Sequence, residues 1–468
     1  MSNSIGIVIL AAGKGTRMKI DTPKALAPAL GRPLLDYVVS ASLDFAKDCA
    51  LIAEIGVVIG HRKELLESWW EGHTSKSAMK LAWQKHQHGT ADALKACFND
   101  LPQFWNHHYT LVACADTPLL SKAELVSLFN VLKNDSTLVG VAATFETQNP
   151  TGYGRIVTQG TGFSIVEEKD ATEEQRKIKE VNSGFYILKT SHVKTILSTI
   201  TNQNKSGEFY LTDLFKPAYA VKPVRFPSET PFLGINTMEQ LSNISMILRD
   251  QKLKQLFADG VQILNPQSCY IENNVKVGIG TVIYPGVTIL GKTEIGSNVI
   301  IESGCFIKDS TIHDRAEILA NSYLEEAIVH NEATIGPMAR LRPGADIGPL
   351  AKVGNFVEVK KSKLGKGAKV SHLSYVGDAE IGENTNIGCG FITCNYDGAN
   401  KHKTKIGKNT FIGSDCQMIA PVEIGDDAFV AAGSTISKSI PDGGFSIARA
   451  QQVIKEGAAK RFIKTKKT

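Results

Sequence analysis

Residues 10–18 read Leu-Ala-Ala-Gly-Lys-Gly-Thr-Arg-Met, a glycine-rich and basic segment that directly follows an apolar run. The run over residues 5–10 has the continuous aliphatic character of a buried strand. Gly13 and Gly15 carry no side chain, so backbone N–H groups in this segment can approach a polyphosphate closely. Arg17 and Lys24 add positive charge close by. We therefore expect a phosphate-binding loop at the end of the first strand.

The spacing in this loop excludes two common phosphate motifs. No Gly-x-x-x-x-Gly-Lys-Ser/Thr run is present, and Met18 stands where the dinucleotide fingerprint has its third glycine. A glycine-rich turn alone is a weak indication, because it also occurs as a bare strand-to-helix connection. The full order Leu-x-Ala-Gly-x-Gly-Thr-Arg-Met, followed by Pro23-Lys24, is more specific. It resembles the signature of the sugar-phosphate nucleotidyltransferases.

Composition limits the class of protein. A chain of 468 residues exceeds what one core usually supports, so we expect two or three domains. No apolar run reaches the roughly 18 residues needed to cross a bilayer, and the net charge of +5 is too small for a general nucleic-acid binder. The eight cysteines are scattered without zinc spacing, which is typical of free thiols in a reducing compartment. We expect a cytoplasmic protein that binds neither membrane nor nucleic acid.

The chain has two halves with different periodicities. Residues 1–237 alternate β-rich runs (residues 5–10, 55–59, 109–113 and 138–143) with helical stretches such as 122–132. This alternation predicts an α/β, Rossmann-like domain with a largely parallel sheet, whose ligands bind at the carboxyl ends of the strands. Residues 238–258 have helical spacing and end before Gly260, so we interpret residues 238–259 as a connecting helical arm.

From residue 260 to the C-terminal tail at residue 468, aliphatic residues recur every six positions. They begin with Val277, Ile283, Ile289, Ile295, Ile301 and Ile307, and the register resumes from Ile312 after a shift of one residue. This period is typical of a hexapeptide parallel β-helix, which in such proteins is generally left-handed, here with about nine coils over residues 275–439. The flat faces of these helices commonly pack as trimers, so we expect a homotrimer. The register breaks over residues 396–403, and an excursion of that size in a solenoid is often functional.

Three motifs carry a resemblance that covers nearly the whole chain. They are Asn355-Phe356-Val357-Glu358, His372 to Asp378, and Thr393 to Gly398. With the order of the two halves, they resemble the bacterial bifunctional N-acetylglucosamine-1-phosphate uridyltransferase/glucosamine-1-phosphate acetyltransferase family. The resemblance implies acetyl transfer from acetyl-CoA to glucosamine-1-phosphate, then Mg²⁺-dependent uridylyl transfer from UTP with release of pyrophosphate. The product, UDP-N-acetylglucosamine, would supply peptidoglycan and lipopolysaccharide synthesis.

In the first half, the resemblance implies a site for two highly charged anions, which calls for a metal ion and cationic side chains. A carboxylate and an amide oxygen, from Asp116 and Asn236, would hold Mg²⁺. Arg17 would act at the transferring phosphates as a catalytic residue. The implied contacts to UTP and to the sugar nucleotide come from Leu10, Ala11, Ala12, Gly13, Lys24, Gln84, Gly89, Thr90, Cys114, Ala115, Asp116, Gly154, Glu167, Asn182 and Asn236.

In the second half, an amine must lose a proton to attack the acetyl group, and histidine is the natural base near neutral pH. The resemblance places His372 in this role, and we expect Glu358 to orient it. The sugar phosphate would contact Arg342, Lys360, Tyr375 and Asn386. The implied acetyl-CoA contacts are Cys389, Asn395, Tyr396, Ser414, Ala432 and Arg449.

This chain departs from the family at two places. Cys114-Ala115 replace the usual Tyr-Gly pair, which removes any contact made by the aromatic ring, and Cys389 replaces a common alanine. Two other functions stay open at this point. One is a single-activity nucleotidyltransferase whose β-helix only assembles or regulates it, although a structural solenoid has no need of His372 with Arg342 and Lys360. The other is a scaffold of two degenerate binding modules, against which the complete set of polar site residues argues.

Overall fold

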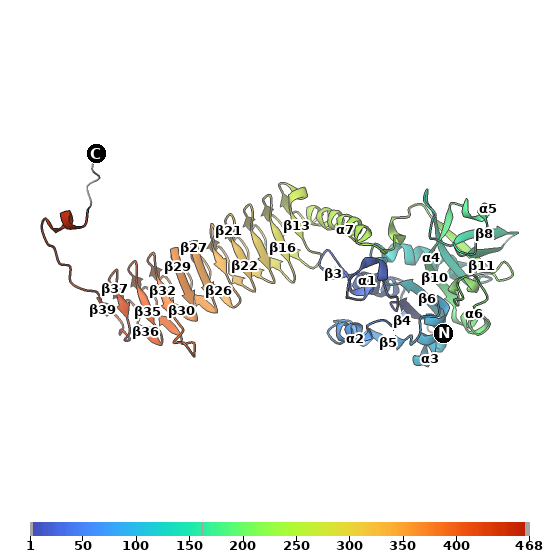
Figure 1. The fold of residues 1–468 in the computed structure, drawn as a ribbon, viewed down its shortest axis with the longest axis horizontal. Coiled ribbons are helices and arrows are strands. Elements are labelled where there is room, and N and C mark those ends of the chain that lie inside the picture. Colours follow the sequence, from blue (N-terminus) through green and yellow to red (C-terminus); the bar gives the residue numbers. More distant parts are fainter. Residues whose placement is uncertain (1–2, 161, 464–468) are drawn as a thin grey trace. The chain divides into compact units, whose positions relative to one another are not determined.

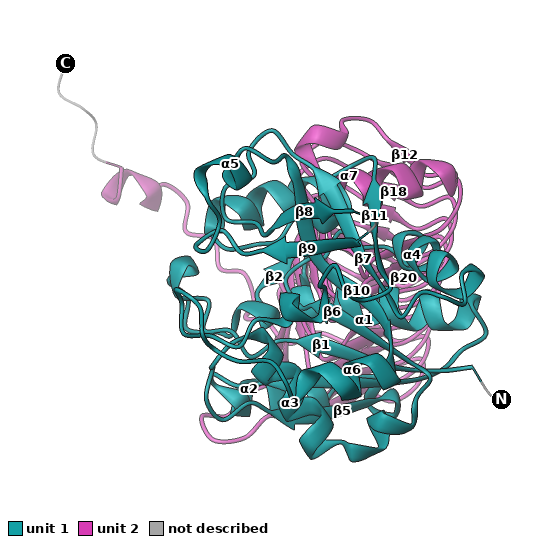
Figure 2. Ribbon diagram, turned by 90° about the vertical axis from the view of Figure 1, so that its right-hand side faces the viewer, with its two compact units in different colours: residues 1–248 teal, residues 249–468 magenta. Residues whose placement is uncertain are grey.

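The computed structural model describes residues 3–160 and 162–463, so the last five residues of the predicted C-terminal tail lie outside the described residues. The fold divides into two compact units, residues 1–248 and 249–468 (Figure 2). This division falls inside helix α7 (Met238–Ala258), which has the bounds of the helix predicted over residues 238–258. In the part of the chain that the structure describes, no helix combines the length and apolarity needed to cross a membrane.

The first unit is built on a twisted sheet with the strand order β11-β7-β10-β6-β1-β4-β5 (Figure 1). Strands β1, β4, β5 and β6 are parallel to one another, which confirms the predicted parallel arrangement at the centre. The strands are β1 (Ser4–Leu10), β4 (Ile52–Ile59), β5 (Met79–Trp83), β6 (Tyr109–Cys114), β7 (Gly140–Glu146), β10 (Glu180–Lys189) and β11 (Val221–Phe226).

Helices cover both faces of this sheet because the strand side chains alternate between two cores. Ile5, Ile7 and Ile9 belong to the core that includes α1 (Leu34–Asp48) and α4 (Lys122–Asn134), whereas Val8 belongs to the core that includes α3 (Thr90–Asp100) and α6 (Thr190–Leu197). A strand buried on both faces must be apolar at every position. The continuous aliphatic run in β1 is thereby explained.

Part of the sheet differs from the prediction. Strand β10 is antiparallel to both β6 and β7, and the hairpin of β8 (Arg155–Gln159) and β9 (Gly162–Val166) adds to its edge. These segments carry polar residues such as Asn182 and Ser183 within otherwise apolar strands, so their periodicity in the sequence is weak. The hairpin and β10 therefore add polar side chains to the sheet, beyond those at the ends of the parallel strands.

The second unit is a solenoid of short parallel strands from β12 (Gln262–Ile263) to β39 (Phe445–Ser446) (Figure 1). In the regular coils a strand pairs with the third strand along the chain, as β14 (Lys276–Val277) does with β17 (Glu294–Ile295), so three strands make one coil. Val277 pairs with Ile295, whereas Ile312 pairs with Val329, one residue fewer per coil. The shift of register seen in the sequence is therefore a shorter coil. This architecture of parallel hexapeptide strands is consistent with the predicted left-handed β-helix.

The in-phase aliphatic residues form the solenoid core, as predicted. Ile283, Ile289, Ile301 and Ile307 are fully buried in it, and Val277 at the first coil is partly buried against it. Each coil thus contributes one inward aliphatic side chain per strand.

Two features interrupt the regular coils. Strands β27 (Lys352–Lys360) and β29 (Lys369–Gly377) have nine residues each, whereas other strands of the solenoid have two or three. Between β32 (Ile392–Cys394) and β33 (Thr404–Ile406) the chain makes the predicted excursion, closed by a bridge between Tyr396 and Lys401.

The register of the solenoid points Ile301 inward and Ile300 outward in β18 (Ile300–Ile301). Replacing these two adjacent isoleucines should therefore lower the stability by unequal amounts. Ile301 is fully buried, so Ile301→Ala should lower the free energy of unfolding by about 2–4 kcal/mol through lost burial and a cavity. Ile300 is 36% exposed, so Ile300→Ala should cost less than about 1 kcal/mol. Urea denaturation followed by circular dichroism measures both variants. Equal losses of stability would contradict the assigned register.

Candidate active sites

A cavity of about 320 Å³ lies at the carboxyl ends of the central strands of the first unit. The loop after β1, the segment after β5, the start of α3 and the end of β6 all contribute to its wall. Most of the predicted nucleotide residues line it, namely Leu10, Ala11, Ala12, Gly13, Lys24, Gln84, Gly89, Thr90, Cys114, Ala115 and Asp116. Gln87 and Glu208 also line it, and sequence reasoning did not single them out.

Cations and acidic or amide oxygens meet at one end of this cavity. The Lys24 ammonium forms an ion pair with Asp116 and donates to Asn236 Oδ1 at 2.9 Å. Arg17 Nη2 donates to the same oxygen at 2.9 Å. The backbone N–H of Ile235 donates to the carbonyl of Asp116 at 3.0 Å, which fixes the loop that carries Asn236. Residues separated by more than a hundred positions in the chain therefore form one polar cluster.

Gln84 and Gly89 shape the wall of the cavity near the start of α3. Gln84 is buried, and its Nε2 donates to Asp92 Oδ2 at 2.8 Å and to the carbonyl of Gly89 at 3.1 Å. Gly89 has φ +126°, and a Cβ there would lie 2.4 Å from the carbonyl oxygen of Phe209. A side chain cannot be accommodated at this position. The hydrogen bonds from Nε2 to Asp92 and to Gly89 hold the side chain of Gln84 at the cavity wall.

Cys114 occupies a position where the family usually has tyrosine. Burial raises the pKa of its thiol to about 12, so the group stays protonated and neutral near neutral pH. The neighbouring Ala115 is also buried. This pair therefore offers the cavity a small apolar wall without charge.

Gly154, Glu167 and Asn182 form a separate group on the hairpin and β10. A Cβ placed at Gly154 would lie 3.5 Å from Asn182 Cβ and 3.7 Å from Glu167 Oε2. Thr212 Oγ1 donates to Glu167 Oε1 at 3.1 Å, and burial raises the pKa of the Glu167 carboxyl. Asn182 Nδ2 donates to the hydroxyl of Tyr186 at 2.7 Å. The structure brings these three predicted sugar-binding residues together.

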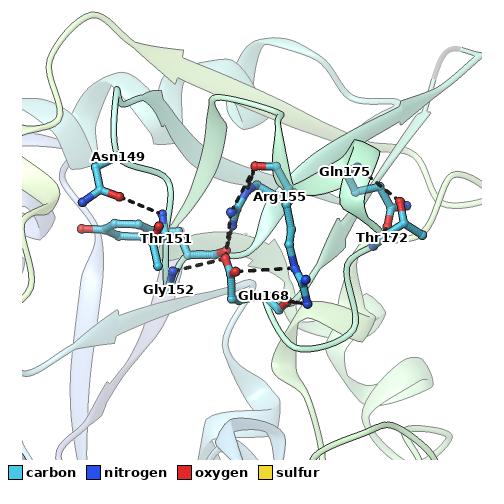
Figure 3. Close-up of polar contacts among 9 residues, drawn as sticks. Asn149, Thr151, Gly152, Arg155, Glu168, Thr172 and Gln175 are labelled. Atoms are coloured by element: carbon cyan, nitrogen blue, oxygen red, sulfur yellow. Dashed lines mark hydrogen bonds and ion pairs between the residues drawn. The ribbon is translucent and has the colours of Figure 1, made fainter.

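A buried arginine anchors the loop that carries Gly154. Arg155 is 2% exposed, and its Nη2 lies 2.7 Å from Glu168 Oε2 (Figure 3). The same carboxylate accepts from the backbone N–H of Gly152 at 3.2 Å. The ion pair and the hydrogen bond to Glu168, whose side chain is 30% exposed, therefore fix both ends of the segment from Gly152 to Arg155.

In the second unit, His372 lies on β29 opposite Asn355 on β27. His372 Nδ1 is 3.1 Å from Asn355 Oδ1. The expectation that Glu358 orients His372 is wrong, because Glu358 Oε1 instead accepts from Arg342 Nη1 at 2.8 Å. This contact raises the pKa of the Arg342 guanidinium. Register explains the difference, since Glu358 lies opposite Tyr375 and not opposite His372.

Lys401 is a cation that sequence reasoning missed. The adjacent ammonium of Lys401 lowers the pKa of Lys360, and the Arg342 guanidinium contributes to the same effect. Asp378 opposes this effect only in part, since the pKa of Lys360 stays lowered. Like charges held together in this way favour an anionic ligand. Lys401 lies in the excursion over residues 396–403, so the break in the six-residue period was the signal that could have found it.

Asp397 fixes the conformation of this excursion. Its carboxylate accepts from the backbone N–H groups of Ala399 at 2.8 Å and Asn400 at 2.6 Å, and it contacts His402 Nε2 at 2.6 Å. These hydrogen bonds hold the pKa of the Asp397 carboxyl well below its usual range. The Lys401 side chain is thereby presented from an ordered loop.

The predicted acetyl-CoA residues fall into two sets. Cys389, Ser414, Ala432 and Arg449 follow β31 (Asn386–Ile387), β34 (Phe411–Ile412), β37 (Phe429–Val430) and β39, which pair in succession, so they lie one coil apart along one corner. Arg449 Nη1 donates to the carbonyl of Ala432 at 2.8 Å. In the second set, Asn395 Nδ2 donates to Asp378 Oδ2 at 2.5 Å, and Tyr396 is exposed. Two other predicted residues, which would contact the sugar, lie on neighbouring strands: Asn386 begins β31, and Tyr375 lies on β29.

Comparisons with protein families match both units separately. The MobA-like NTP transferase domain matches residues 7–178, the bacterial transferase hexapeptide (six repeats) matches residues 403–438, and the GMPPB C-terminal domain matches residues 265–342. The crystal structure of UDP-glucose pyrophosphorylase complexed with UDP-glucose covers 53% of this chain and 99% of its own, at 19% identity and a TM-score of 0.41. That likeness is too distant to guide the interpretation.

Similarity to curated proteins extends over nearly the whole length. The Bifunctional protein GlmU of Geotalea uraniireducens (strain Rf4) is 42% identical, over 97% of this chain and 98% of that protein. Those of Trichlorobacter lovleyi (strain ATCC BAA-1151 / DSM 17278 / SZ) and Pelobacter propionicus (strain DSM 2379 / NBRC 103807 / OttBd1) are 40% and 39% identical, over 96% and 97% of this chain and 97% and 98% of their own. The chain therefore belongs to the GlmU family of bifunctional enzymes, in which a nucleotidyltransferase half is joined to a hexapeptide-repeat acetyltransferase half.

Proposed function

We propose that the chain makes UDP-N-acetylglucosamine in two transfers, acetylation of glucosamine-1-phosphate followed by uridylylation of N-acetylglucosamine-1-phosphate. The observation that carries the second transfer is the convergence of the glycine-rich loop, Lys24, Gln84, Gly89, Thr90 and Asp116 on one cavity. The sugar phosphate attacks the α-phosphorus of UTP, and pyrophosphate leaves. Because the nucleophile is already an anion, the site needs positive charge and orientation rather than a base.

The oxygen donors at the cavity fit a magnesium ion. Asp116 supplies a carboxylate and Asn236 an amide oxygen, which are the hard oxygen ligands that Mg²⁺ takes alongside phosphate oxygens and water. The two side chains already share the Lys24 ammonium as a cationic partner, so they converge on one point. When bound, the ion would neutralise the charge of the reacting phosphates. Lys24 and Arg17 would supply positive charge to the phosphates of UTP.

The sugar of N-acetylglucosamine-1-phosphate binds at Gly154, Glu167 and Asn182. Glu167 and Asn182 offer acceptors and donors for hydroxyl and acetamido groups. Gly154 lets its backbone pass close to both of them and to Ile165, whose Cγ2 would lie 2.9 Å from an added Cβ. Gln84 meets the uracil edge through its Oε1, which can accept from the N–H of the base, because both hydrogens of Nε2 are donated to Gly89 and Asp92.

Acetyl transfer takes place on the second unit, at the corner defined by β27, β29 and the excursion over residues 396–403. Arg342, Lys360 and Lys401 hold the sugar phosphate, with Tyr375 and Asn386 on the sugar. His372 takes a proton from the amine as the N–C bond forms; the C–S bond breaks, and CoA leaves with the electron pair and is protonated to the thiol. Acetyl-CoA lies along Cys389, Ser414, Ala432 and Arg449, with Asn395 and Tyr396 beside its acetyl end.

We further propose that the protein works as a homotrimer in the cytoplasm and supplies precursor for peptidoglycan and lipopolysaccharide. The solenoid supports the oligomer proposal, because flat parallel coils offer long faces for packing against further copies. The scattered free cysteines are consistent with a reducing compartment.

Replacing Asp116 by alanine should lower uridylyl transfer by about a hundredfold or more, because it removes the proposed carboxylate ligand. Acetyl transfer should be unchanged. Release of pyrophosphate from UTP and N-acetylglucosamine-1-phosphate, at saturating Mg²⁺, measures the effect. Asp21→Ala is the matched control, since the Asp21 side chain is fully exposed in the neighbouring loop. Full uridylyl transfer by Asp116→Ala would overturn the metal assignment.

A chain that ends at Ile447 lacks Arg449 and should lose acetyl transfer by about tenfold or more, because the cofactor's phosphates lose a cationic partner. Uridylyl transfer should be retained. A chain that ends at Gln452 keeps Arg449 and serves as the control. Both are assayed by free CoA thiol and by pyrophosphate release. Equal loss of the two activities in the shorter chain would count against the acetyl-CoA assignment.

A further inference from the structure

Asn355 and His372 occupy equivalent positions on two successive coils. Strands β27 and β29 run parallel for nine residues each, and their register pairs Asn355 with His372. Phe356 and Leu373, one residue further on, share the left-handed conformation, with φ of 57° and 35°. The two backbones are in close contact here, since a Cβ at Gly354 would lie 1.9 Å from the carbonyl oxygen of Ser371. This packing fixes the side chain at position 355 against the side chain at position 372.

The hydrogen bond between the two side chains has a defined donor and acceptor. Asn355 Oδ1 lies 3.1 Å from His372 Nδ1, and an amide oxygen can only accept a hydrogen bond. The proton of neutral His372 is therefore on Nδ1, and Nε2 keeps its lone pair. We propose that Asn355 is a positioning residue that holds His372 as the Nδ1–H tautomer, with Nε2 directed to the amine of the acetyl acceptor. This inference rests on the proposed role of His372 as the base.

A neutral partner suits this role better than a carboxylate would. A carboxylate next to the ring would favour the imidazolium, which cannot accept the proton of the amine. Glu358 is the acid on β27, and it is engaged by Arg342 and lies opposite Tyr375.

The remaining titratable groups around His372 belong to its own strand and to the strands on either side. β27 carries Lys352 and Lys360, β29 carries Lys369 and Tyr375, and Cys389 and Cys394 lie on the following coil. Among the residues that the structure describes, the hydrogen bond found for the ring of His372 is the one to Asn355. The tautomer therefore depends on this amide.

The pH dependence of acetyl transfer tests the inference on the full chain. Asn355→Asp preserves shape and adds a negative charge, so the imidazolium should persist to higher pH and the acidic limb of the kcat profile should move up by about one pH unit. Asn355→Ala should lower kcat by about tenfold with KM for glucosamine-1-phosphate nearly unchanged, because the base loses its orientation and tautomer. Asn331→Ala, elsewhere on the solenoid, is the matched control and should leave both quantities unchanged. A profile of Asn355→Asp that superimposes on that of the wild type would overturn the proposal.

The tautomer can also be measured on the wild-type protein, without an Asn355 variant. In wild-type protein labelled with ¹⁵N-histidine, the His372 ring is assigned by its absence from the spectrum of His372→Gln. Long-range proton–nitrogen correlations should show Nδ1 protonated and Nε2 bare, and the reverse pattern would refute the proposal. Failure of the underlying assignment looks different: His372→Gln would then retain acetyl transfer. Loss of acetyl transfer in His372→Gln, with no effect in either Asn355 variant, would reject only the positioning role.

Discussion

Parallel strand register is the constraint on which both halves of this protein depend. In the first unit, β1, β4, β5 and β6 all end at the same edge of the sheet, so the glycine-rich loop, Gln84 and Asp116 meet although the chain between them is long. In the second unit, the same kind of pairing stacks coil on coil, and it places Asn355 opposite His372 and Glu358 opposite Tyr375. A shift by one residue would turn the inward aliphatic side chains outward and separate the polar pairs. The backbone hydrogen bonds between parallel strands therefore fix both the hydrophobic cores and the positions of the polar site residues.

Charge is arranged differently in the two sites. At the proposed nucleotide cavity, Lys24 is neutralised by Asp116, whereas Arg17 contacts only the neutral amide oxygen of Asn236 among the interactions of the described residues. At the proposed acetyl-transfer site, Arg342 is paired with Glu358, whereas Lys360 and Lys401 face each other and the pKa of Lys360 is lowered. A phosphate that binds between the two lysines removes their repulsion, which supports recognition of a phosphorylated sugar there. At the nucleotide cavity, by contrast, we expect a phosphate of UTP to replace Asp116 as the ionic partner of Lys24.

Much of this organisation could be predicted from the sequence, because it follows from periodicity and from short motifs. The strand of residues 5–10, helix α7 and the inward positions of the solenoid are observed where they were predicted. Strand β10 and its hairpin were missed, because their polar residues mask the alternation that marks a strand. The partner of His372 was also missed, since it depends on which residues of two strands pair. The position of Lys401 was missed as well, because it depends on how an irregular loop folds back. No periodicity of the sequence describes that loop.

We propose that two independent sites on separate units act in sequence on one sugar phosphate. Formation of UDP-N-acetylglucosamine from glucosamine-1-phosphate, acetyl-CoA, UTP and Mg²⁺ by an equal mixture of the Asp116→Ala and His372→Ala proteins tests this scheme. The mixture should form the product, because the acetylated intermediate diffuses from one protein to the other, whereas Asp116→Ala alone should form it more slowly by about a hundredfold or more, and His372→Ala alone should also be much slower than the mixture. Equal rates from the mixture and from either variant alone, or no product from a mixture in which each variant retains its remaining activity, would contradict the two-site scheme.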